Sequence, residues 1–140
     1  MVTTPKHFVA NVGDGGRDSY PAEVSRGWLE ALHFPPFREA LRAGGARSVM
    51  ASYNSIDGAP ATASRWLLTD KLRGDWGFDG VVISDAGAVG GANVLHMTAP
   101  DYPTSTVRAL DAGLDVILQP RSITPRSSGR LSPPGGSRQR

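Results

Sequence analysis

The sequence predicts an α/β fold in which parallel strands alternate with helices. Three short apolar runs rich in β-branched residues recur about 33 residues apart, at positions 48–51, 80–84 and 114–118. This interval accommodates a strand, a crossover helix and the return to a parallel strand. The runs are almost continuously apolar rather than alternating, which is typical of strands that helices cover on both faces.

Helical patterns fill the intervals between these strands. Residues 23–41 are expected to form two short helices with a bend, because apolar side chains recur with helical spacing on either side of Pro35 and Pro36. Two further helices are expected, one capped by Ser64 and ending at Gly74, the other over residues 104–112 and ending at Gly113.

The composition favours one ordinary domain. The 140 residues are 39% hydrophobic and include 17 Gly and 11 Pro, which excludes a collagen, a coiled coil and a fully disordered chain. The absence of Cys excludes disulfides, thiolate metal ligands and a cysteine nucleophile. No apolar run approaches the roughly 18 residues of a membrane span, and residues 1–5 lack the features of a signal peptide. We therefore expect no membrane partner, and the compartment stays open.

Charge divides the chain into a body and a tail. Residues 1–120 carry 10 Lys and Arg against 13 Asp and Glu, whereas residues 121–140 carry five Arg and no acid. The tail is rich in Ser, Pro and Gly and has few apolar side chains, so we expect it to be disordered. Because the body is mildly acidic, a nucleic-acid partner is not expected.

Polar and reactive side chains follow the apolar runs. Tyr53 and Asn54 come after the first run, Asp85 follows the second, and Lys6 and His7 lie beside a weaker apolar stretch near the N-terminus. Chemistry in α/β proteins gathers at the carboxyl ends of parallel strands. These residues are therefore expected to meet at one edge of the sheet. The three His residues show no metal-ligand spacing and the glycines match no nucleotide-binding motif, so no metal and no cofactor are expected.

Five stretches together resemble glycoside hydrolase family 3, the β-glucosidase and β-xylosidase group. In chain order they are Lys6-His7-Phe8, residues 48–54, residues 66–70, residues 72–80 and Val82-Ile83-Ser84-Asp85. The resemblance implies a (β/α)8 barrel followed by a second domain. A full barrel needs about 250 residues. Residues 1–120 are accordingly expected to form a partial TIM barrel, roughly the last four β/α units.

The resemblance assigns Asp85 as the nucleophile of a retaining glycosidase. Such an enzyme needs a carboxylate beside the anomeric carbon, where it forms a glycosyl-enzyme intermediate. The alternative is that Asp85 caps the turn over residues 87–91. The family's motif often continues with Trp where this chain has Ala86, which removes a surface on which a sugar could stack.

Five further residues are candidates for substrate binding by the same resemblance. Lys6 and His7 match the pair that grips sugar hydroxyls, Tyr53 matches a hydrogen-bonding group near the nucleophile, and Met50 matches an apolar surface. Arg17 lies in a glycine-rich turn like that of the family. The alternatives are a solvated surface pair for Lys6 and His7, core packing for Met50 and Tyr53, and an exposed loop charge for Arg17.

The sequence offers no convincing general acid. A retaining mechanism needs a second carboxyl about 5–5.5 Å from the first. Glu23, Glu30 and Glu39 are expected to face outward from helices, and the loop residues Asp14, Asp18 and Asp57 have turn roles, so none is assigned.

By this resemblance, the chain is expected to be a fragment of a retaining hydrolase that acts on terminal β-linked glucose or xylose, and to be inactive alone. The alternative is a non-catalytic truncated product or sugar-binding remnant, and either could self-associate through the open edges of a half-barrel.

Overall fold

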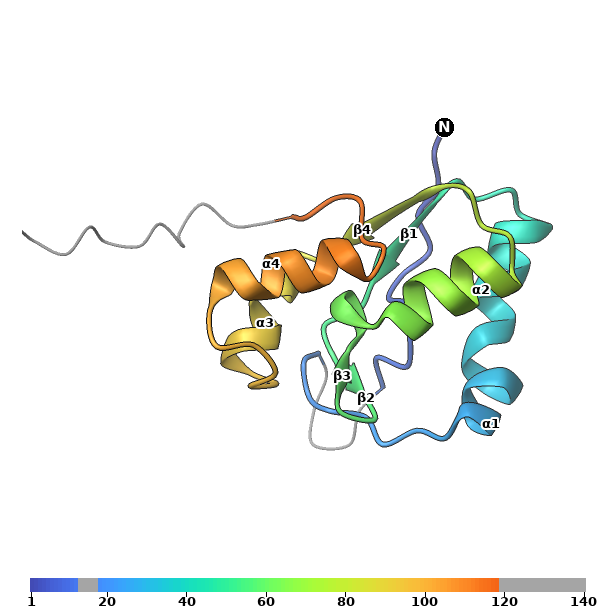
Figure 1. Cartoon of the computed structure of the whole chain (residues 1–140). Helices are drawn as coiled ribbons and strands as arrows, with labels where there is room; N and C mark the ends of the chain where they lie inside the picture. The colour runs from blue at the N-terminus through green and yellow to red at the C-terminus, as the bar shows by residue number, and fades with distance from the viewer. Residues whose placement is uncertain (13–17, 119–140) are drawn as a thin grey trace, which may run out of the picture.

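Parallel chain segments lie side by side at the centre of the fold. The computed structural model describes residues 1–12 and 18–118, so the candidate Arg17 and the expected tail over residues 121–140 lie outside the described residues. Strand β1 (Ser48–Ala51) pairs in parallel with β4 (Val81–Ser84), from Ser48 beside Val81 to Ala51 beside Ser84. Figure 1 shows these two strands between two groups of helices. The expectation of an α/β fold with parallel strands is confirmed.

Two further segments extend this pair on either side. The Phe8 N–H donates to the Met50 carbonyl at 2.7 Å, and the Ser52 N–H donates to the Phe8 carbonyl at 2.7 Å. On the other side, the Ser84 N–H donates to the Val116 carbonyl at 2.8 Å. The expected strand over residues 114–118 is reduced to a single bridge between Ile83 and Val116. The four segments therefore follow chain order across the sheet.

One helical run covers residues that were expected to form two bent helices. It begins after Ser25 and comprises α1 (Arg26–Trp28), a π-helical segment η1 (Leu29–His33) and α2 (Phe34–Arg42). The expected interruption at Pro35 and Pro36 is wrong, because both prolines lie in the first turn of α2, which follows the π-helical segment without a break. The run begins at residue 26 rather than 23, since the Ser25 hydroxyl accepts a hydrogen bond from the Trp28 N–H.

The other expected helices are present with shifted ends. The π-helical segment η3 (Trp66–Asp75) follows Ser64, whose hydroxyl accepts from the Leu67 N–H as expected. Helix α4 (Tyr102–Asp111) begins two residues early because the Asp101 carboxylate caps it. The elements not expected from the sequence are the hairpin β2 (Ser55–Ile56) and β3 (Ala59–Pro60), the short η2 (Ala61–Ala63) and α3 (Ala88–Val94). Among the described residues, no helix combines the length and apolarity needed to cross a membrane.

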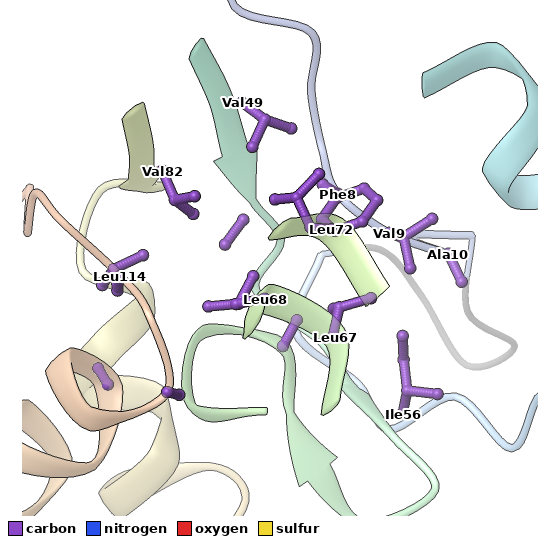
Figure 2. Packing of buried hydrophobic residues seen from close by; sticks show 14 of the residues in the cluster. Phe8, Val9, Ala10, Val49, Ile56, Leu67, Leu68, Leu72, Val82 and Leu114 are labelled. Atoms are coloured by element: carbon purple, nitrogen blue, oxygen red, sulfur yellow. The ribbon is translucent and has the colours of Figure 1, made fainter. Parts of the chain in front are cut away.

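The core lies between the central strands and η3. Leu67, Leu68 and Leu72 from η3 are buried in one cluster with Val49 of β1 and with Phe8 (Figure 2). Phe8 also makes edge contacts with the rings of Phe37 and Trp76, at centroid distances of 5.1 and 5.8 Å. Phe8 directly follows Lys6 and His7, so its burial in the core fixes the chain next to these two residues.

A polar network ties β4 to the segment that follows α4. Arg73 donates to the Asp115 carboxylate at 2.6 Å and to the Gly113 carbonyl at 3.2 Å. The same Asp115 oxygen accepts the Val82 N–H at 2.7 Å. This network satisfies a strand donor at the end of β4 opposite to Asp85 and holds the adjoining segment in place.

Replacing Leu72 by Ala tests the packing of η3 on the strands. Leu72 is fully buried, so the Leu72→Ala change should lower the free energy of unfolding by about 2–5 kcal/mol. The matched control is Leu110→Ala on α4, where the side chain is 49% exposed and the loss should be far smaller. Urea denaturation measures both, and equal losses would contradict the packing.

Candidate active site

Asp85 lies at the carboxyl end of β4, directly after its last paired residue. Its N–H donates to the Ala51 carbonyl at 3.3 Å, and its own carbonyl accepts the Ala88 N–H at 3.1 Å. Between these points the chain turns at Gly87, whose φ of 77° is a left-handed conformation that favours glycine. Asp85 is 8% exposed, so the strand and the turn hold a buried carboxylate in a fixed position.

The two oxygens of this carboxylate have different surroundings. Oδ1 accepts hydrogen bonds from the Tyr53 hydroxyl at 2.8 Å and from the Ala86 N–H at 2.7 Å. Oδ2 lies 3.0 Å from His7 Nε2 but receives no hydrogen bond from a described residue. The contact with Ala86 is the turn-capping role that formed the alternative interpretation. It occupies Oδ1 alone and leaves Oδ2 available for other chemistry.

The strand neighbours of Asp85 supply the other two groups of the site. His7 precedes the anchored Phe8, and Tyr53 follows β1. The rings of His7 and Tyr53 lie 6.3 Å apart at an interplanar angle of 37°. The Val9 carbonyl accepts from the Ser52 hydroxyl at 3.2 Å and from the Asn54 amide at 3.3 Å, which joins the two chain segments below the site. The expected gathering of His7, Tyr53 and Asp85 at one sheet edge is therefore observed.

The environment of Tyr53 keeps its phenol protonated. Burial is the largest cause that raises the pKa of Tyr53, to about 12, followed by the hydrogen bond to Asp85 and the negative charges of Asp85 and Asp18. A phenol with this pKa is a hydrogen-bond donor throughout the neutral range. Tyr53 is thus a fixed donor to the Asp85 carboxylate.

The remaining candidates make no side-chain contact with Asp85 in the described part of the chain, or lie outside it. The Lys6 side chain is exposed next to His7 in the chain, and Met50 is half-buried within β1 and takes no part in the hydrogen bonding of Asp85. Glu30 is held by Lys71 at 2.7 Å on the helical layer, as expected for an outward-facing residue. Within residues 1–12 and 18–118, no three His, Cys, Asp or Glu side chains gather as metal ligands would.

His96 is a neighbour of the site that the sequence reasoning missed. Its Nε2 lies 2.9 Å from the Tyr53 carbonyl oxygen, 43 residues earlier in the chain. Its partner is a backbone atom, so no pairing of side-chain types in the sequence signals the contact. In the sequence, His96 shows no metal-ligand spacing and belongs to none of the stretches that resemble the family.

An α/β fold with a buried carboxylate at the carboxyl end of a parallel strand is an architecture found in many enzymes. Residues 1–129 match the family model described as the glycosyl hydrolase family 3 N-terminal domain, and the chain belongs to this family. The predicted resemblance to this family is confirmed.

Two curated relatives of this chain are a beta-glucosidase and a beta-xylosidase. The chain is 41% identical over 120 residues to a periplasmic beta-glucosidase of Salmonella typhimurium, covering 84% of this chain and 15% of the relative. It is 33% identical over 119 residues to a beta-xylosidase of Formosa agariphila, covering 84% of this chain and 16% of the relative. The chain thus spans about a sixth of the length of these proteins.

Solved structures share the fold of this chain. A β-glucosidase from Erythrobacter marinus matches with a TM-score of 0.81 and 38% identity, over 86% of this chain and 16% of that structure. A family 3 exo-β-xylosidase, solved in complex with a xylobiose aziridine probe, matches with a TM-score of 0.79 and 28% identity, over 84% and 16% of the two chains. The central strands and the helices around them therefore follow the architecture of family 3 β-glucosidases.

The raised pKa of Tyr53 predicts how stability changes at high pH. In the unfolded chain the phenol ionises near its ordinary pKa of 10, but in the folded chain it ionises at about 12. The stabilising contribution is therefore complete below pH 10 and is lost between pH 10 and 12. The variant Tyr53→Phe should lose less stability over this interval than the parent, as measured by urea denaturation at each pH. Parallel curves for the two proteins would contradict the raised pKa.

Proposed function

We propose that Asp85 is the nucleophile of a retaining glycoside hydrolase site that acts on terminal β-linked glucose or xylose. The observation that carries this proposal is the unequal bonding of the Asp85 carboxylate. Oδ1 is held by hydrogen bonds from Tyr53 and Ala86, whereas Oδ2 faces His7 Nε2 at 3.0 Å and receives no hydrogen bond from a described residue. A nucleophilic carboxylate needs one oxygen to fix its orientation and another to attack. The names of the relatives, beta-glucosidase and beta-xylosidase, support the substrate class.

The reaction proceeds in two steps at this carboxylate. In the first, Oδ2 of Asp85 forms a bond to the anomeric carbon while the bond to the leaving oxygen breaks, and a general acid protonates that oxygen. In the second, water deprotonated by the same group attacks the anomeric carbon and releases Asp85. In this proposal His7 and the neighbouring Lys6 bind sugar hydroxyls and Met50 supplies an apolar surface to the sugar, while Arg17, a substrate-binding candidate by the resemblance, lies outside the described residues.

The general acid is not assigned to a residue of this chain. The described carboxylates on the helices are exposed or paired, as Glu30 is with Lys71. We propose that this chain corresponds to the later part of the family's barrel and that the acid comes from another part of a complete enzyme. The chain alone is then expected to bind a sugar without turning it over, which is also the behaviour of the non-catalytic alternative.

Covalent trapping separates the nucleophile from the unassigned acid. Dinitrophenyl 2-deoxy-2-fluoro-β-glucoside, with its xyloside analogue, has a leaving group that departs without protonation. Incubation should therefore add the mass of one fluoroglycosyl group, and peptide mass spectrometry should locate it on Asp85. The reaction should be abolished in Asp85→Asn.

The matched control for trapping is Asp111→Asn. Asp111 lies at the exposed end of α4, and this variant should be labelled like the parent. Absence of a label from the parent at saturating reagent, or a label that persists in Asp85→Asn, would overturn the assignment. If Asp85 is labelled but the chain releases no phenol from an aryl glucoside whose leaving group needs protonation, the result would agree with a chain that lacks its general acid.

The edges of the central sheet predict self-association. Residues 5–8 and 115–118 form the two outer segments, and no described segment pairs with their outer sides. Unpaired strand edges join readily to other chains. Light scattering at micromolar concentration should give about twice the chain mass of 14.8 kDa.

A charged side chain at one edge should reduce this association. Val116 is 39% exposed at the outer segment, so Val116→Lys should shift the mass toward one chain. The control is Val107→Lys on the exposed face of α4, where Val107 is 56% exposed. A monomeric parent would contradict the proposal, as would equal effects of the two changes.

A further inference from the structure

We infer that His96 is a positioning residue, which holds the backbone of Tyr53 so that the phenol reaches Asp85. The inference rests on the proposed function of Asp85 and adds a residue to that site. His96 lies two residues after α3, the helix that begins immediately beyond the Asp85 turn. The chain thus returns from Asp85 through α3 to the carbonyl of Tyr53.

The position of His96 is set by its own backbone. The N–H groups of Leu95 and His96 both donate to the Gly91 carbonyl at 2.9 Å, which closes the end of α3. The neighbouring Thr98 and Ala99 N–H groups donate to the Ala92 carbonyl at 2.8 and 3.2 Å. The imidazole therefore extends from a hydrogen-bonded turn rather than from a free loop.

The contact with Tyr53 defines the protonation of the ring. A carbonyl oxygen only accepts hydrogen bonds, so Nε2 must carry the proton that it donates over 2.9 Å. Nδ1 is buried and has no partner in the described part of the chain. A donor proton on Nε2 rather than on Nδ1 fits this arrangement, because a proton on Nδ1 would be a buried donor without an acceptor among the described residues.

Tyr53 is consequently held at two ends. Its carbonyl accepts from His96, and its hydroxyl donates to Asp85 Oδ1 at 2.8 Å. Of the described residues, none supplies a backbone N–H to the Tyr53 carbonyl outside the regular elements. Loss of the imidazole donor would leave this carbonyl free to rotate, and the phenol at the other end would lose its alignment with the carboxylate.

The test observes Tyr53 directly and needs no turnover. Tyrosine labelled with carbon-13 at the ζ carbon gives three signals, since the chain has three Tyr, and Tyr→Phe variants assign them. The chemical shift of the Tyr53 ζ carbon in Asp85→Asn gives the reference position for a phenol that no longer donates to a carboxylate. In His96→Leu, the Tyr53 signal should move at least half of the way to that position at pH 7.

A conservative variant separates positioning from general packing. The amide nitrogen of Gln lies near the place of Nε2, so His96→Gln should keep the Tyr53 signal close to that of the parent. His96→Asn keeps an amide, but its side chain is too short to reach the Tyr53 carbonyl. The Tyr53 signal in His96→Asn should therefore move as it does in His96→Leu. His96→Asn takes the place of His96→Leu in the test if His96→Leu does not fold. A Tyr53 signal that stays at the parent position in the folded variant lacking the donor would overturn the inference. So would equal shifts in His96→Gln and His96→Asn.

The two proposals can fail separately. If the fluoroglycoside labels Asp85, His96→Gln should be labelled at a rate within about threefold of the parent, and His96→Leu at least tenfold more slowly. If the parent is not labelled but the Tyr53 signal moves as expected, the nucleophile is refuted and the positioning role stands. If labelling occurs at equal rates in the parent and His96→Leu, the nucleophile stands and the positioning role is refuted.

Discussion

The parallel register of β1 and β4 is the constraint on which the site depends. Ala51 pairs with Ser84, so the residues that follow these strands emerge at the same edge of the sheet. A shift of one residue would move every side chain of a strand to the opposite face. The register is secured at both ends of β4: the Ala51 carbonyl accepts the Asp85 N–H at 3.3 Å, and the Arg47 carbonyl accepts the Val81 N–H at 3.0 Å. The packing of η3 and the alignment of Tyr53 with Asp85 both presuppose it.

Burial of polar groups then gives the site its chemical asymmetry. An isolated buried carboxylate is costly, and here the Tyr53 hydroxyl and the Ala86 N–H offset this cost at one oxygen only. The other oxygen, Oδ2, lies 3.0 Å from His7 Nε2 and receives no hydrogen bond from a described residue. The supporting contacts come from chain segments before and after β4, which explains why the turn-capping and nucleophile interpretations of Asp85 are compatible. Oδ1 is bonded within the fold, whereas Oδ2 faces only His7 and is the oxygen that the proposal assigns to the reaction.

The sequence predicted those features that have a local signal. The strands over residues 48–51 and 81–84 are continuous apolar runs, and the Ser64 cap precedes an apolar helix in a recognisable order. The hairpin of β2 and β3 was missed because two-residue strands have no periodicity to detect. The helix across Pro35 and Pro36 was missed because a proline pair reads as a break until its place in the first turn is known. Asp85, Tyr53 and His7 follow or flank apolar runs, whereas His96 reaches a backbone carbonyl far away in the chain, a contact that only the folded structure reveals.

The most direct test of this account is a crystal structure of the chain after reaction with the fluoroglucoside. The account predicts an ester between the anomeric carbon and the Asp85 oxygen that faces His7, with the Tyr53 hydroxyl still donating to the other oxygen. An ester on the oxygen that faces Tyr53, or on a different residue, would contradict the division of roles within the carboxylate.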